Sequence, residues 1–376
     1  MTSHVQPRPS ISTQTCLVAI AIFMLAAFCY AQGSADWTEF TRINAQRYNP
    51  YEKTLGIKNV GNLVLKWSYA DGDISYSSPV VANGVLYIGS YDWSLYALNA
   101  STGSLLWTYQ ANGPMEAGIA EANGVVYAGS NDGNLYALNA TTGALLWVFP
   151  APYGVSGELA IANGLIYFAS DGNGNSNIYA LNSTTGASVW HNTNTGEYLD
   201  AMANGVVYTT DNHLAFYALK ANTGAVLWSV NGIDGGSAAV VKGVLYLNAR
   251  GITALNASNG TVLWNTSIQY ASGMPAVANG MLYIGSLRKG NVYALNTKTG
   301  KVLWTYQTGG PVESSVAVAN GVVYVSATNA SGMYALNAQT GKLLWNYNTG
   351  FTQSSPIIVN GMVYVGSGGT YAFGLP

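Results

Sequence analysis

The sequence predicts an all-β protein, an eight-bladed β-propeller whose blades are four-stranded antiparallel sheets. Three observations predict this fold: a tryptophan recurs about every 40 residues, an Asn-Gly pair recurs with a similar spacing, and no stretch of ten residues has a helical pattern of apolar side chains. Repeats of this length occur in propeller blades and in helical arrays. Short β-rich segments separated by turns exclude the helical class.

The tryptophan repeat covers most of the chain. Eight of the ten tryptophans belong to it, and two, Trp37 and Trp93, do not. The repeated residues are Trp67, Trp107, Trp147, Trp190, Trp228, Trp264, Trp304 and Trp345. Successive members are 36 to 43 residues apart, so each interval has room for four short strands and their turns.

The first complete repeat gives the order of the strands. An Asn-Gly pair at 83–84 joins strands expected at 79–82 and 85–88. This pair favours a tight hairpin turn because both of its residues must adopt positive φ. A third strand is expected at 95–98 and a fourth at 105–109. The same order in later repeats predicts one antiparallel blade per repeat.

The two ends of the repeat region predict how the ring closes. The eighth repeat has strands at 355–359 and 362–366 and a third near 371–373, and the chain then ends. A spare strand lies at 63–69, before the first complete repeat. We expect this N-terminal strand to complete the last blade, which removes an open sheet edge. The propeller is therefore expected over 63–376.

The N-terminal segment resembles a secretory signal peptide over 1–31, followed by a lead-in segment over 32–62. Residues 17–28 are an unbroken apolar run of twelve, shorter than the ~20 residues of a membrane helix. We therefore expect an exported chain, periplasmic or secreted, with no transmembrane span after cleavage. Phe28 directly precedes Cys29, where a lipoprotein signal requires a small residue, so a lipid anchor is disfavoured.

The composition limits the classes of partner. Charged residues make up 8% of the chain, against the ~25% of average proteins, and the net charge is −2. A protein that binds the phosphates of nucleic acid needs clustered Lys and Arg, so no nucleic-acid partner is expected. The 12% aromatic content excludes a disordered chain. We expect a folded monomer.

One segment of the repeat carries a family resemblance. Residues 97–107 match the pattern A-x-[DN]-x-x-T-G-x-x-x-W. The pattern recurs complete at 137–147, 180–190, 294–304 and 335–345, and with one change at 218–228 and 254–264. It resembles the tryptophan-docking motif of pyrroloquinoline-quinone (PQQ) repeats, which build quinoprotein-like eight-bladed propellers. In this motif the Asn caps a turn, the Gly supplies positive φ, and the Trp packs between blades.

The resemblance implies two functions. BamB-like propellers are non-catalytic periplasmic scaffolds of outer-membrane protein assembly, and the undecorated blades of this chain resemble them. The resemblance therefore implies a binding scaffold with a protein partner from the outer-membrane assembly machinery, and no cofactor. The alternative is a PQQ-dependent oxidoreductase, similar to the quinoprotein alcohol dehydrogenases, with PQQ and Ca²⁺ on the propeller axis, or a degenerate PQQ or small-ligand binder. Those enzymes place a pair of adjacent cysteines against the cofactor, and this chain lacks such a pair.

Catalytic patterns are missing from the sequence. The only histidines beyond the signal peptide are His191 and His213, which lack the H-x-x-x-H spacing of zinc sites. The G-x-S-x-G pattern of α/β-hydrolases is also missing. We assign no catalytic residue, and the sequence favours a protein that is not an enzyme.

The scarce charges predict a binding face around the propeller axis. In a propeller, the second-to-third and fourth-to-first connections of every blade share one face. Where the first strands begin, this face would carry Tyr76, Glu116, Glu197, Glu313 and Gln353. In the second-to-third loops it would carry Asp92, Asp132, Asp171, Asp211, Arg250 and Arg288. We predict that this axial face binds a partner or ligand; the alternative is that these loops are charged because they are exposed to water.

A second candidate site lies in the longest repeat. Asp171, Asn173 and Asn175 place side-chain oxygens at alternate positions, as Ca²⁺-binding loops do. Only one of the three is a carboxylate, which weakens the case for a metal. The favoured interpretation is a polar loop inserted between two strands, and the metal site is the alternative.

Overall fold

A computed structural model describes the chain within residues 36–376. The described residues are 36–39, 46–70, 77–152, 154–172, 175–193, 195–211, 213–233, 236–249, 251–328 and 332–376. The predicted signal peptide at 1–31 lies outside them. None of the helices in the described ranges is both long enough and apolar enough to cross a membrane.

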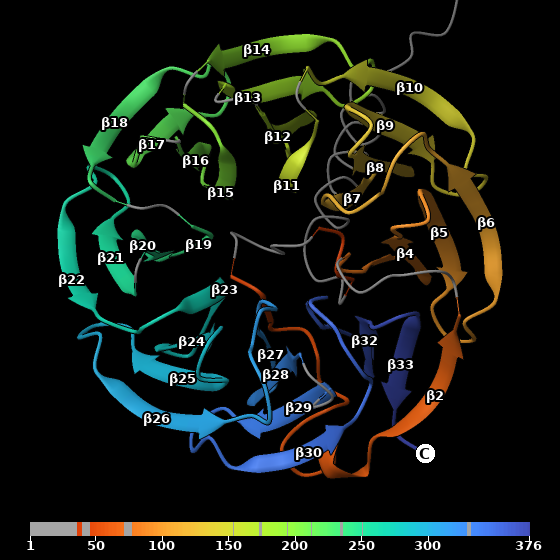
Figure 1. Ribbon diagram of the computed structural model, residues 1–376, viewed down its shortest axis with the longest axis vertical. Helices are drawn as coiled ribbons and strands as arrows, with labels where there is room; N and C mark the ends of the chain where they lie inside the picture. Colours follow the sequence, from red (N-terminus) through yellow and green to blue (C-terminus); the bar gives the residue numbers. More distant parts are fainter. Residues whose placement is uncertain are drawn as a thin grey trace, which may run out of the picture. The chain divides into compact units, whose positions relative to one another are not determined.

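Eight sheets arranged in a ring confirm the predicted propeller (Figure 1). Blades 1 to 4 are β3 (Val80–Ala82), β4 (Val85–Gly89), β5 (Ser94–Asn99) and β6 (Leu105–Gln110); β7 (Ile119–Ala122), β8 (Val125–Ser130), β9 (Asn134–Asn139) and β10 (Leu145–Pro150); β11 (Ser156–Ala162), β12 (Leu165–Gly172), β13 (Asn175–Asn182) and β14 (Ser188–Thr193); and β15 (Tyr198–Ala203), β16 (Val206–Thr210), β17 (Ala215–Lys220) and β18 (Val226–Asn231). The first strand of each blade lies nearest the axis and the fourth lies at the rim (Figure 1).

The remaining four blades follow the same antiparallel order. They are β19 (Ala238–Val241), β20 (Val244–Asn248), β21 (Ile252–Asn256) and β22 (Val262–Thr266); β23 (Ala271–Ala278), β24 (Met281–Ser286), β25 (Asn291–Asn296) and β26 (Val302–Gln307); β27 (Ala317–Ala319), β28 (Val322–Ala327), β29 (Gly332–Asn337) and β30 (Leu343–Tyr347); and β31 (Ile357–Val359), β32 (Met362–Gly366) and β33 (Thr370–Gly374). The fourth strand of blade 8 is β2 (Val64–Tyr69), which pairs antiparallel with β33. The predicted closure of the ring is thus confirmed.

Each repeated tryptophan attaches its blade to the next one. The indole of Trp107 in blade 1 donates a hydrogen bond to the carbonyl of Ala140 in blade 2, over 3.0 Å. Gly143 has a φ of 71°, and a Cβ at this glycine would lie 2.7 Å from the Trp107 ring. Trp345 of blade 7 donates to the carbonyl of Leu63, directly before β2. The pairs around the ring are Trp67–Ala100, Trp107–Ala140, Trp147–Ser183, Trp190–Ala221, Trp228–Ala257, Trp264–Thr297, Trp304–Ala338 and Trp345–Leu63.

The turns divide the propeller into two faces. The Asn-Gly turn between the first and second strands lies beside the Thr-Gly turn between the third and fourth. In blade 1, the Ala100 N–H of the second turn donates to the Gly84 carbonyl of the first, over 2.9 Å. We call this side the Asn-Gly face. The opposite side, which carries the second-to-third and fourth-to-first connections, is the loop face.

The lead-in segment enters the centre of the ring, which the sequence analysis did not anticipate. Strand β1 (Tyr48–Asn49) pairs parallel to β27 as a fifth strand of blade 7. Trp37 forms a β-bridge to Val81 of blade 1, and Glu39 forms one to Ala120 of blade 2. After β1 the segment continues to the short 3-10 helix η2 (Val60–Asn62) and then to β2. The lead-in therefore joins the inner strands of blades that are far apart in the sequence.

Replacing Gly186 by alanine should destabilise the fold by about 2–4 kcal/mol. The new Cβ would lie 2.8 Å from the Trp147 ring, and a φ of 71° disfavours any Cβ. The control is Gly164→Ala, whose φ is 75° but whose Cβ would meet nothing within 4 Å. Backbone strain alone should cost the control about 1–2 kcal/mol. Chemical denaturation measures both; equal losses would mean that the tryptophan contact contributes nothing.

Candidate functional site

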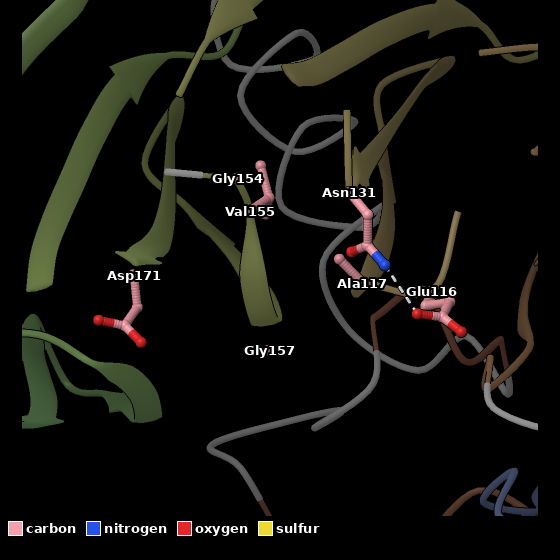
Figure 2. Close-up of a pocket in the computed structure, with 7 residues that line it drawn as sticks. All are labelled: Glu116, Ala117, Asn131, Gly154, Val155, Gly157 and Asp171. Carbon is pink, nitrogen blue, oxygen red and sulfur yellow. Dashed lines mark hydrogen bonds between the residues drawn. The ribbon is translucent and has the colours of Figure 1, made fainter. Parts of the chain in front are cut away.

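The loop face contains a cavity between blades 2 and 3 with a volume of about 370 Å³. Its lining residues are Glu116, Ala117, Asn131, Gly154, Val155, Gly157 and Asp171. Figure 2 shows the carboxylates of Glu116 and Asp171 on opposite sides of it. The Asn131 side chain donates to Glu116 Oε2 over 2.7 Å. The sequence predicts Glu116 at the start of a first strand and Asp171 in a second-to-third loop, and the two carboxylates line one cavity.

The acidic character continues into blade 4. Burial raises the pKa of Tyr198, and the negative charges of Glu197, Asp171 and Asp200 raise it further. Asp200 is 1% exposed, and burial raises its pKa well above the usual value despite a hydrogen bond from Thr210. Its Oδ1 atom is buried without a hydrogen-bond partner within the described ranges. Sequence reasoning missed Asp200 because it lies inside an inner strand, away from the loops.

Two further residues of the predicted face contact each other across a blade boundary. Gln353, before blade 8, donates from Nε2 to the Glu313 carboxylate, before blade 7. A carboxylate and an amide therefore share a hydrogen bond at the loop-face mouth of the ring. The structure places Glu116 at the cavity, Glu197 beside Tyr198 of blade 4, and Glu313 in this separate pair.

The aspartates of the second-to-third loops shape their own turns. Asp92 accepts the backbone N–H of Ser94 and the hydroxyl of Tyr96, the latter over 2.6 Å. Asp132 accepts the Tyr136 hydroxyl over 2.6 Å. Asp211 makes the same pair of contacts, with the Ala215 N–H and the Tyr217 hydroxyl. These carboxylates therefore have a structural role, and their role in binding stays a prediction.

The predicted basic part of the face is described at Arg288 and Lys289. Arg288 donates to the Tyr270 hydroxyl over 2.8 Å, and its guanidinium lies 4.2 Å from the centre of the Tyr270 ring. Arg250 and Tyr76 lie outside the described residues. Arg288 thus stacks on an aromatic ring of its own blade.

The candidate metal residues lie at the end of a long hairpin. Strands β12 and β13 each have eight residues, and their length accounts for the long repeat. Most of the expected loop is therefore part of these two strands. Asp171 pairs across the hairpin with Ser176, whose hydroxyl donates to it over 2.9 Å. Asn173 and the side chain of Asn175 lie outside the described part of the chain. Among the residues described, no group of three His, Cys, Asp or Glu side chains is placed to bind a metal. A calcium site here stays a prediction.

Arg47 lies in the centre of the ring. It is the one fully buried arginine among the described residues. It is 0% exposed and donates to the carbonyls of Val316 and Pro356. Its guanidinium lies 5.3 Å from the centre of the Trp37 ring. Burial raises the pKa of Glu158 to about 8, although the positive charge of Arg47 opposes this shift. The only signal in the sequence was an isolated arginine in a lead-in poor in charge.

Fold and repeat motif together define a PQQ-repeat propeller. The model of the family described as outer membrane protein assembly factor BamB matches residues 25–173, 114–231, 151–271 and 248–375. The chain belongs to this family. No curated protein matches the sequence significantly.

Three solved structures have a fold similar to that of this chain. The chain is similar to the quinohemoprotein alcohol dehydrogenase ADHIIG from Pseudomonas putida HK5, with a TM-score of 0.75, 17% identity, and coverage of 92% of this chain and 81% of that one. It is similar to BamB from Moraxella catarrhalis, with a TM-score of 0.70, 19% identity, and coverage of 83% and 99%. The computationally designed Ika8 protein gives 0.68, 15% identity, and coverage of 83% and 100%. Identities this low establish a shared fold alone.

The described residues around the axis do not match the three carboxylates of PQQ. PQQ carries three carboxylates, so its site needs cations that are free to face it. The described residues of the loop face near the axis are instead acidic, with Glu116, Glu197 and Glu313. Arg47 is buried and bonded to two backbone carbonyls, and Arg288 contacts Tyr270. We therefore derive no chemistry from this cofactor.

Stability should fall as the pH rises from about 4.5 to about 8. In this window the folded chain holds protons on Asp200 and Glu158 that the unfolded chain releases, because burial raises both pKa values. Asp200→Asn should reduce the slope of melting temperature against pH, and its stabilising effect should grow as the pH rises. Asp92→Asn, at an exposed turn of the same face, is the control. A melting temperature that rises through this window would contradict the assignment.

Proposed function

We propose that this protein is an exported, non-catalytic scaffold that binds a protein partner through its loop face in outer-membrane protein assembly. Membership of the family described as outer membrane protein assembly factor BamB supports this proposal. The predicted signal peptide supports export. Fold similarity does not distinguish a scaffold from an oxidoreductase, so the proposal depends on the chemistry of the face.

The main support for the proposal is the charge of the loop face, which is negative, whereas the Asn-Gly face carries lysines. Carboxylates of the loop face are Asp92, Glu116, Asp132, Asp171, Glu197, Asp211 and Glu313. The described cations on this face are Arg288 and Lys289, in the loop between β24 and β25. In a chain with 8% charged residues, such a concentration gives one face a negative potential. That potential attracts and orients a basic segment of a partner.

The cavity between blades 2 and 3 gives this face a recessed contact point. Glu116 and Asp171 lie on opposite sides of it, and Asn131 donates a hydrogen bond to Glu116. A lysine or arginine of the partner can enter between the two carboxylates and exchange its water for charge-assisted hydrogen bonds. The exposed outer parts of the face then form the rim of the interface.

Neutralising Glu116, Glu197 and Glu313 together to glutamine should abolish partner binding while the fold stays as stable or becomes more stable. Glutamine keeps the size of each side chain, and loss of like charges removes repulsion. The measurement is recovery of outer-membrane assembly proteins on the immobilised chain, with a melting curve of the variant. The control variant neutralises Lys220, Lys242 and Lys298 on the opposite face.

Lower stability with unchanged recovery would contradict the proposal, because the carboxylates would then be structural. The oxidoreductase alternative has its own measurement. If incubation with PQQ and Ca²⁺ gives a bound-quinone absorbance and alcohol-dependent reduction of a dye, the chain is an enzyme and the proposal fails.

A further inference from the structure

The Asn-Gly face has the opposite charge to the loop face. Eight lysines of this face are described, and all are exposed: Lys53, Lys58, Lys66, Lys220, Lys242, Lys298, Lys301 and Lys342. They follow the ring over blades 4 to 8. The carboxylates described beside these turns are fewer. Glu121 and Glu52 are buried and accept backbone N–H groups, Asp36 accepts the Asn83 N–H, and Glu39 accepts the Ile161 N–H. The face is therefore a positively charged surface.

Exposed aliphatic side chains surround the same face. In every blade the fourth strand has a β-bulge just before its tryptophan, as between Leu105 and Trp107. A bulge turns two successive side chains outward. Leu105 and Leu106 are accordingly 45% and 50% exposed. Equivalent exposed residues are Leu65, Leu145, Leu146, Val189, Val226, Leu227, Val262, Leu263, Val302, Leu303 and Leu343. These residues, two in each of five blades and one each in blades 3, 7 and 8, follow a Thr-Gly turn or its equivalent, so the apolar rim lies next to the positive face.

A second cavity lies on this face, under blades 7 and 8. It has a volume of about 370 Å³ and is lined by Lys53, Thr54, Gly56, Ile57, Lys58, Asn59 and Asn320. Two ammonium groups, a hydroxyl and two amides are the donors that bind a phosphate group.

The segment that forms this cavity is attached firmly to the propeller. Asn320 donates to the Leu55 carbonyl over 2.9 Å, and the Gly361 N–H donates to Glu52 over 2.9 Å. Asn59 closes the segment on itself by accepting the Gly56 N–H. The exposed apolar side chains beside it are Ile57, 46% exposed, and Tyr51, 38% exposed.

We propose that the Asn-Gly face docks on an anionic phospholipid surface, with a headgroup phosphate in the cavity between Lys53 and Lys58. Ile57 and Tyr51 then enter the headgroup region, as apolar side chains of peripheral proteins do. Lysines near an anionic membrane each add to the attraction, and their long stems let neighbouring apolar atoms approach the lipid.

A lipid surface matches these features better than a protein domain does. Every blade has at least one of these exposed aliphatic residues and the lysines lie over blades 4 to 8, whereas a partner domain contacts one sector. The cations described on this face are all lysines, which bind phosphate as point charges without the fixed geometry of arginine. This inference is independent of the proposed function. Docking in this way would point the acidic loop face away from the membrane.

The test is flotation of the chain from residue 32 onward with lipid vesicles, since all described strands and their closing contacts lie within 36–376. We expect binding to vesicles of phosphatidylglycerol and phosphatidylcholine, little binding to phosphatidylcholine alone, and loss of binding at high salt. The double variant Lys53→Gln and Lys58→Gln should bind about 30-fold more weakly. The control is Lys289→Glu, which lowers the net charge equally but lies on the loop face.

A third variant tests the apolar contact. Ile57→Ser should weaken vesicle binding and leave the retention of inorganic phosphate unchanged. The proposal is overturned if the chain does not bind the anionic vesicles, or if the lysine double variant and Lys289→Glu weaken binding equally. Retention of inorganic phosphate by a chain that does not bind the vesicles would make a free anion the ligand and also overturns the proposal. Binding to an acidic polypeptide such as polyglutamate, but not to vesicles, would identify a protein surface as the partner.

Discussion

The contact between each repeated tryptophan and the turn of the next blade is the interaction on which the rest of the structure depends. The Trp147 indole bonds to the Ser183 carbonyl and its ring packs on Gly186, where a side chain would collide with it. One residue type thus fixes both the spacing and the angle between neighbouring blades. Because the last link, from Trp345 to Leu63, returns to the N-terminal strand, the contacts form a closed ring with no free end.

A tyrosine on the second strand strengthens this contact in most blades. The hydroxyl of Tyr87 donates to the same Ala140 carbonyl as Trp107, and the two rings lie 5.8 Å apart. The loop-face connections take no part in these contacts between blades, so they can differ from blade to blade. The second-to-third loops and the inner strand ends have accumulated carboxylates, while lysines lie beside the turns of the opposite face. The repeat provides the framework, and the loops and turns provide the charge.

The sequence predicts the framework well because each part of it depends on local chemistry. The Asn-Gly turns adopt positive φ, 51° at Asn83 and 54° at Asn123, as their composition requires. The closing strand also follows from counting repeats. The site is less predictable, because it depends on contacts between distant residues. Glu116 and Asp171 line one cavity, and Arg47 bonds to carbonyls of blades 7 and 8 that lie 269 and 309 residues away in the sequence. No periodic pattern contains that information.

The hydrogen-exchange rate of the tryptophan indole N–H groups, measured residue by residue in the folded protein, tests the docking of the blades most directly. The account predicts slow exchange for the eight repeated tryptophans, because each donates to a carbonyl of the following blade. It predicts fast exchange for Trp93, which is 48% exposed and lies outside the repeat. Exchange of the repeated indoles at the rate of Trp93 would contradict the account.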